Sequence, residues 1–108
     1  MVTRKFPRYQ AQITSVLMQR DRLKYNASIH DVSLKGCRVE SVIKPFTGMQ
    51  LEVSLLLPGE AAPIIITNAA VRWTGSHGIG IEFLTIAPPQ LERLTHLITK
   101  LSSNTRAA

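Results

Sequence analysis

Apolar and polar side chains alternate along most of the chain before residue 86, a two-residue period that is typical of strands with one buried face. The clearest run extends from Met49 to Leu57, in which every second residue is Met, Leu or Val. The same period is found at residues 10–18, 24–32, 37–40, 64–73 and 79–83. The pattern therefore predicts roughly six short strands.

Turn signals separate these strands and indicate how they connect. Charged residues, Gly or Pro cluster at residues 19–22, 31–36, 45–48, 58–59 and 74–78, which predicts close antiparallel connections. Within residues 64–73 the apolar positions change from even to odd numbers. Such a change predicts a β-bulge near Thr67 or Asn68, because one extra residue reverses the faces of all that follow.

The period changes again after Pro88 and Pro89. Apolar residues then recur at helical spacing and form one stripe: Leu91, Leu94, Ile98 and Leu101. We expect a helix over residues 89–102, laid on the sheet, and a disordered tail over residues 103–108. Short antiparallel strands favour a closed sheet, because open edges would otherwise need protection. The expected fold is mostly β: a roughly six-stranded antiparallel β-barrel at residues 10–86 with a C-terminal α-helix.

Length and charge limit the choices further. The chain has 108 residues, enough for one domain over residues 1–108, in which residues 1–9 would form a flexible basic arm. The net charge of +6 predicts attraction to phosphate-bearing partners. Cys37 is the one cysteine, so no internal disulfide can form, and we expect it in the core. No apolar run approaches the roughly 20 residues of a spanning helix. We expect a cytoplasmic protein without membrane insertion.

Two arginines of the basic arm are spaced to bind a ligand with two phosphates. Arg4 and Arg8 lie four residues apart, and Pro7 favours an extended chain over a helix. An extended chain advances about 3.3 Å per residue, so the two side chains would be roughly 13 Å apart on one side of the arm. Each guanidinium can donate two parallel hydrogen bonds to a phosphate or to a guanine edge.

The segment from Asp31 to Gly36 has the composition of a polar turn between two strands. Asp31 and Ser33 carry short side chains that bond to nearby backbone, and Gly36 permits a left-handed or close-approach conformation. Asp31 cannot attract phosphate, so we expect it to accept hydrogen bonds from guanine or from an arginine. Ser33 would donate a hydrogen bond or cap the turn, and Gly36 would leave room for the ligand.

These two segments resemble the motifs of the PilZ family, R-x-x-x-R near the start and [D/N]-x-S-x-x-G further along the chain. Arg4 and Arg8 match the first motif, and the second is matched by Asp31, Ser33 and Gly36. The segment at residues 78–83 and the expected helix are also similar to that family. The resemblance implies a bacterial receptor for cyclic di-GMP, with these five residues as its ligand-binding set and no cofactor. It also implies an unidentified downstream protein, which we expect to detect ordering of the arm.

The aromatic and basic residues near position 73 leave two interpretations open. Trp73 has the parity of Ala69 and Val71, so we expect it in the core, with base stacking as the alternative. Arg72 has the opposite parity and would extend the basic surface.

Enzymatic functions find little support. His30, Asp31 and Ser33 are neighbours in one strand and face alternate sides, which excludes a catalytic triad. The other histidines lack the grouping of a metal site. Two further functions stay open: a small basic β-barrel that binds nucleic acid through its charge, and a PilZ-like protein-interaction module without ligand. Base-stacking platforms are few, so we expect no specific nucleic-acid binding.

Overall fold

The computed structural model describes residues 6–43 and 45–106. Along the chain it contains six strands and one helix: β1 (Tyr9–Gln19), β2 (Lys24–Val32), β3 (Gly36–Ser41), β4 (Gln50–Leu56), β5 (Ile64–Gly75), β6 (Gly78–Thr85) and α1 (Pro88–Arg106). The predicted fold class, a six-stranded antiparallel barrel with a C-terminal helix, is confirmed.

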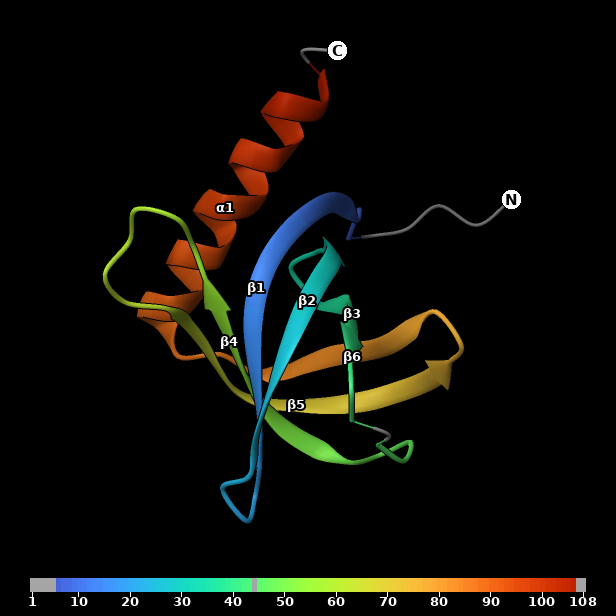
Figure 1. Cartoon of the computed structure of the whole chain (residues 1–108). Helices are drawn as coiled ribbons and strands as arrows, with labels where there is room; N and C mark the ends of the chain where they lie inside the picture. The colour runs from blue at the N-terminus through green and yellow to red at the C-terminus, as the bar shows by residue number, and fades with distance from the viewer. Residues whose placement is uncertain (1–5, 44, 107–108) are drawn as a thin grey trace.

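The strands form a closed barrel in the order β1-β2-β3-β6-β5-β4, and every neighbouring pair is antiparallel (Figure 1). Most neighbours in the barrel are also neighbours along the chain. The exceptions are β1 with β4 and β3 with β6, the two pairings that close the ring. The pairing of β3 with β6 brings the polar turn after β2 against the last strand.

The alternating apolar residues fill the barrel, as their period predicts. Leu17, Ile29, Val53 and Ile66 have no exposed surface. Ser15 occupies an inward position between such residues and is also fully buried. Its hydroxyl donates a 2.7 Å hydrogen bond to the Ser54 carbonyl, which removes the cost of burying an unpaired polar group. Cys37 is a buried core residue, as expected.

Two irregularities in β5 decide which side chains reach the surface. Between the pairs Val53–Ile66 and Leu51–Ala69, β5 contains one residue more than β4, so the predicted bulge at 67–68 is confirmed. A second shift lies between Val71 and Trp73, opposite consecutive residues of β6. This second bulge turns the indole outward, and Trp73 is 40% exposed. The expectation that Trp73 packs in the core is wrong, because the second bulge breaks the parity that Trp73 shares with the buried residues Ala69 and Val71.

The hairpin between β5 and β6 is longer than the sequence suggested. The turn expected at 74–78 contains only two residues outside strands, because β5 continues to Gly75 and β6 begins at Gly78. The turn is therefore shorter and the strand ladder extends closer to its tip.

The helix α1 packs against β1 and β5 (Figure 1). Its Leu94 is fully buried. Arg93 holds the helix to the loop after β4, donating 2.8 Å and 2.6 Å hydrogen bonds to the carbonyls of Pro63 and Ala62. The helix runs to Arg106, so residues 103–106, which we expected to be disordered, are helical. Neither Gly nor Pro follows Ser102 to end the helix. Among the helices of the described ranges, none has the length and apolarity to cross a bilayer.

Candidate ligand-binding site

Ser33 organises the turn that joins β2 and β3. Its side chain is almost fully buried. The hydroxyl oxygen accepts hydrogen bonds from the backbone N–H groups of Lys35 and Gly36 at 3.0 Å and 3.2 Å. The Ser33 N–H donates to the Gly36 carbonyl at 2.8 Å, which closes the turn. Ser33 therefore fixes the turn's conformation through contacts with its own backbone.

Gly36 is required by the close approach of β3 to β6. It pairs with Glu82, and a Cβ atom at position 36 would overlap the carbonyl oxygen of Ile81. The Lys35 carbonyl accepts a 2.8 Å hydrogen bond from the N–H of Phe83, so the turn lies directly on β6. Of the two conformations expected for Gly36, the structure shows close approach between strands.

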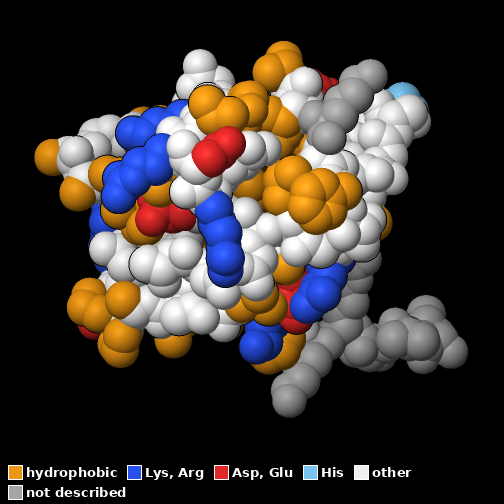
Figure 2. Space-filling model, turned by 90° about the horizontal axis from the view of Figure 1, so that it is seen from below, with side chains coloured by type: hydrophobic (Ala, Val, Ile, Leu, Met, Phe, Trp, Pro, Cys, Tyr) orange, Lys and Arg blue, Asp and Glu red, His pale blue; other side chains and the backbone are white. Residues whose placement is uncertain are grey.

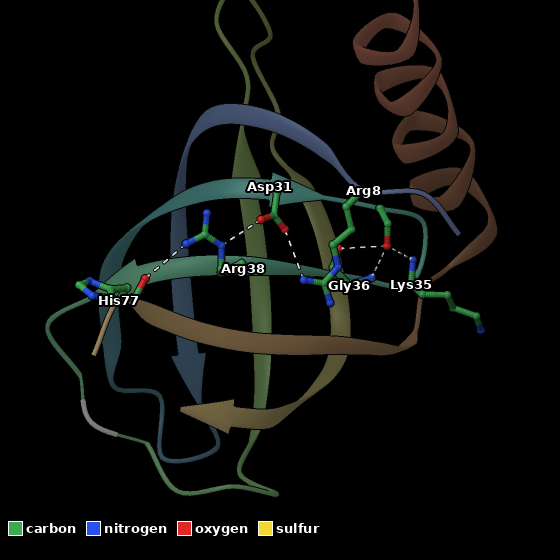
Figure 3. A network of polar contacts seen from close by, with 7 residues as sticks. Arg8, Asp31, Lys35, Gly36, Arg38 and His77 are labelled. Carbon is green, nitrogen blue, oxygen red and sulfur yellow. Dashed lines mark hydrogen bonds and ion pairs between the residues drawn. The ribbon is translucent and has the colours of Figure 1, made fainter. Parts of the chain in front are cut away.

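Asp31 lies between two arginines at the end of β2 (Figure 3). Arg38 Nε donates a 2.9 Å hydrogen bond to Asp31 Oδ2, and Arg8 Nη1 lies 3.6 Å from Asp31 Oδ1. The Asp31 side chain is only 17% exposed, and within the described residues its Oδ1 is buried without a hydrogen-bond partner. Of the two donors expected for Asp31, the structure therefore supplies arginine.

The end of the N-terminal arm lies beside this turn. The Arg8 side chain is 32% exposed and directed at Asp31. Phe6 is half-buried, and the Lys35 ammonium lies 5.5 Å from the centre of its ring, within the range of a cation–π contact. Arg4, the other arginine of the motif, falls outside the described residues and stays a prediction.

A depression of about 430 Å³ opens on this side of the barrel. It is lined by residues of the arm, the turn, β5 and β6: Phe6, Arg8, Ser33, Lys35, Gly36, Arg72, Trp73, Gly80, Ile81 and Glu82. Three of them are cations, while Glu82 is the one carboxylate among them and pairs with Arg72. The depression thus combines an excess of positive charge with an exposed indole, which suits a ligand that carries phosphates and aromatic bases.

The structure brings three of the five predicted site residues, Arg8, Ser33 and Gly36, to this depression. Asp31 is not among its lining residues and contacts it through Arg8. Lys35 and Arg38 were missed by sequence reasoning. The signal for Arg38 was present, because a short turn that pairs Val32 with Cys37 necessarily places Arg38 opposite Asp31.

Cys37 lies behind the turn as part of the barrel interior. The pKa of its thiol is raised to about 12, mainly because the thiol is buried and in addition because of the negative charge of Asp31, while Arg8 acts in the opposite direction. A thiol in this environment is a poor nucleophile at neutral pH.

The serine and the histidine near Asp31 in the sequence are occupied by other contacts in the part of the chain that the structure describes. The Ser33 hydroxyl is engaged by its turn, and His30 Nε2 lies 4.0 Å from a carboxylate oxygen of Glu40. No three metal-ligating side chains gather among residues 6–43 and 45–106.

Comparisons with known proteins agree with this geometry. The PilZ domain model matches residues 3–100. The fold is similar to the PilZ domain with c-di-GMP of YcgR from Escherichia coli, with TM-score 0.75 and 17% identity over 98% of this chain and 96% of that one. It is also similar to the PilZ domain of CeSA from a cellulose synthesizing bacterium, with TM-score 0.70 and 18% identity over 89% and 98% of the two chains.

A third similar structure is the Bacillus subtilis inhibitor of motility (MotI/DgrA), with TM-score 0.77 and 19% identity over 98% of this chain and 54% of that chain. At these identities the likenesses show the fold alone. No curated protein matches the sequence at a significant level. Because the domain model matches nearly the whole chain, the protein belongs to the PilZ domain family, a family of cyclic di-GMP receptors.

Proposed function

We propose that this protein binds cyclic di-GMP in the depression beside the β2–β3 turn. The observation that carries the proposal is the meeting of Arg8, Lys35, Arg72 and Trp73 in one depression that is also lined by Ser33 and Gly36 of the β2–β3 turn. The cations come from the arm, the turn and β5, so the fold gathers charges that are far apart along the chain. Such a cluster favours a compact ligand with more than one phosphate.

Each group has a role that follows from its chemistry. Arg8 would bind a phosphate through its fork of N–H donors, and Arg4 would do the same by its place in the motif. The exposed indole of Trp73 offers a face for stacking a guanine base. Ser33 and Gly36 act as scaffold, because their contacts fix the turn against β6. Asp31 acts on the ligand through Arg8.

The proposed output passes to a protein partner through the arm. Phe6 and Arg8 lie beside the turn, so a ligand bound in the depression would contact the arm directly. Cyclic di-GMP would give Arg4 a phosphate partner and fold the arm over the depression, creating a surface that a second protein can recognise. Ligand binding and the change in the protein surface would then occur together.

The surface gives less support to nucleic acid as the ligand. Figure 2 shows one end of the molecule, where apolar, basic and acidic side chains are mixed and no broad basic stripe appears. In addition, Arg38, Arg72 and Arg93 are each paired with a carboxylate. A compact ligand that binds in one depression therefore fits this surface better than nucleic acid, which needs an extended basic face.

Calorimetric titration tests the proposal. The protein should bind cyclic di-GMP with much higher affinity than GMP or the linear dinucleotide, because only a compact ligand can engage several of the cations together. Arg8→Ala should lose most of the affinity, whereas Arg20→Ala should not, since Arg20 contacts Gln50 at the far end of β1. Equal affinity for GMP and cyclic di-GMP, or binding to neither, would refute the proposal.

A further inference from the structure

The carboxylate of Asp31 is shared unequally between its two arginines. Arg38 Nε makes a 2.9 Å hydrogen bond to Oδ2, whereas Arg8 Nη1 lies 3.6 Å from Oδ1, beyond hydrogen-bonding distance (Figure 3). Arg8 is therefore oriented by the charge of Asp31 without being bonded to it. Its N–H donors stay free for a ligand, as far as the contacts within the described residues show.

Arg38 is held in place from three directions. The register of β2 and β3 pairs it directly with Asp31. Its Nη1 donates a 3.4 Å hydrogen bond to the carbonyl of His77 in the β5–β6 turn. Its stem runs beside Gly78, where a Cβ atom would come within 3.3 Å of Arg38 Cγ. Arg38 is thus a fixed partner for Asp31, while Arg8 approaches Asp31 without a hydrogen bond from the segment before β1.

We propose that Arg38 is a positioning residue that keeps Arg8 available to the ligand by occupying the Asp31 carboxylate. This inference rests on the proposed function, because it concerns the affinity of the same site. Arg38 does not line the depression, so it acts through Asp31 and Arg8.

A largely buried carboxylate is costly to leave without its partner. If Arg38 loses its guanidinium, Arg8 is the one arginine left beside the Asp31 carboxylate among the described residues. An unpaired buried charge is costly, so Arg8 would move the short distance needed to form a direct, forked pair with Asp31. A phosphate would then have to compete with Asp31 for Arg8, and the affinity for the ligand would fall.

The decisive experiment is a set of calorimetric titrations with cyclic di-GMP. Arg38→Met keeps the stem that packs beside Gly78 and removes the donors. We expect it to weaken binding about tenfold, the change that one charge-assisted hydrogen bond typically makes. Adding Asp31→Asn to Arg38→Met removes the charge that captures Arg8, so the double variant should recover most of that loss. Arg20→Met is the matched control, and its affinity should equal that of the wild type.

The recovery of affinity in the double variant distinguishes a positioning role of Arg38 from a direct contact with the ligand or a purely structural role. If Arg38 contacted the ligand itself, or only stabilised the turn, the double variant would bind as weakly as Arg38→Met or more weakly, which would overturn the proposal. An Arg38→Met affinity equal to the wild type would overturn it too. Arg38→Lys keeps one cation beside Asp31 and should bind with intermediate affinity, which also tests the proposal if Arg38→Met fails to fold. Failure of the wild type to bind would instead refute the proposed function.

Discussion

The indole of Trp73 lies against Gly80 and occupies the space that a Cβ atom at position 80 would fill. The two residues are cross-strand neighbours, because Trp73 pairs with Gly80 after the second bulge of β5. Because Gly80 has no side chain, the Trp73 ring can lie directly on the backbone of β6 at the edge of the depression. This contact makes Trp73 a rigid platform in the proposed site.

Trp73→Ala should weaken cyclic di-GMP binding by about tenfold, because stacking on an aromatic ring contributes roughly 1–3 kcal/mol per base. Trp73→Phe should retain most of the affinity, and Gly80→Ala should resemble Trp73→Ala because it displaces the indole. Trp73 is the one tryptophan of the chain, so ligand-induced quenching of intrinsic fluorescence measures the contact directly. Unchanged fluorescence on saturation would mean that the ligand does not reach Trp73.

Gly36→Ala should destabilise the fold, because the new methyl group would overlap the Ile81 carbonyl in the paired strand. Overpacking of this kind typically costs about 1–3 kcal/mol, which corresponds to a Tm lower by roughly 5–15 °C in a domain of this size. Gly75→Ala is the control, since the nearest atom to its Cβ would be 3.8 Å away. A Gly36→Ala variant as stable as Gly75→Ala would show that β3 and β6 separate easily.

Because the thiol pKa of Cys37 is raised by folding, we expect the folded protein to lose stability at alkaline pH. Its pKa is raised from 9.0 to about 12 in the folded protein, so between these two values the unfolded thiol ionises while the folded thiol stays protonated. Stability is therefore complete below pH 9 and falls as pH rises, with a slope of up to about 1.4 kcal/mol per pH unit. Urea denaturation at pH 8 and pH 10.5 should show a smaller loss in Cys37→Ala than in the wild type. An equal loss in both proteins would contradict the raised pKa.

The arm should become protected when cyclic di-GMP binds. Ordering the backbone of each residue costs roughly 1–2 kcal/mol of conformational entropy, which contacts with the ligand would offset. Hydrogen exchange at residues 3–9 should therefore slow in the presence of the ligand. A ligand at about 100 times its Kd should also stabilise the protein by roughly 2.7 kcal/mol, seen as a higher Tm. A chain that begins at Tyr9 should fold without showing that rise. Equal exchange with and without ligand would refute arm ordering even if the ligand binds.

Sequence patterns predicted the barrel well because its core depends on one repeated rule. Alternation within each strand fixed which residues face inward, as the full burial of Leu17 and Val53 shows. The site was harder to predict because it depends on exceptions to that rule. The bulge before Trp73 has no signature in the apolar pattern, since Ala69, Val71 and Trp73 keep one parity. Alternation in β3 is enough to place Arg38 on the outer face, but its partner follows from strand register, which alternation alone does not specify.

The two pairings that close the barrel, β1 with β4 and β3 with β6, determine when during synthesis the proposed site can form. Both join segments distant along the chain, and such contacts form late and slowly in folding because long loops must close first. The turn with Ser33 is held by the N–H of Phe83, near the end of the last strand. A nascent chain therefore contains the arm and the turn long before it contains β6, and the proposed site is incomplete until β6 is synthesised and paired with β3.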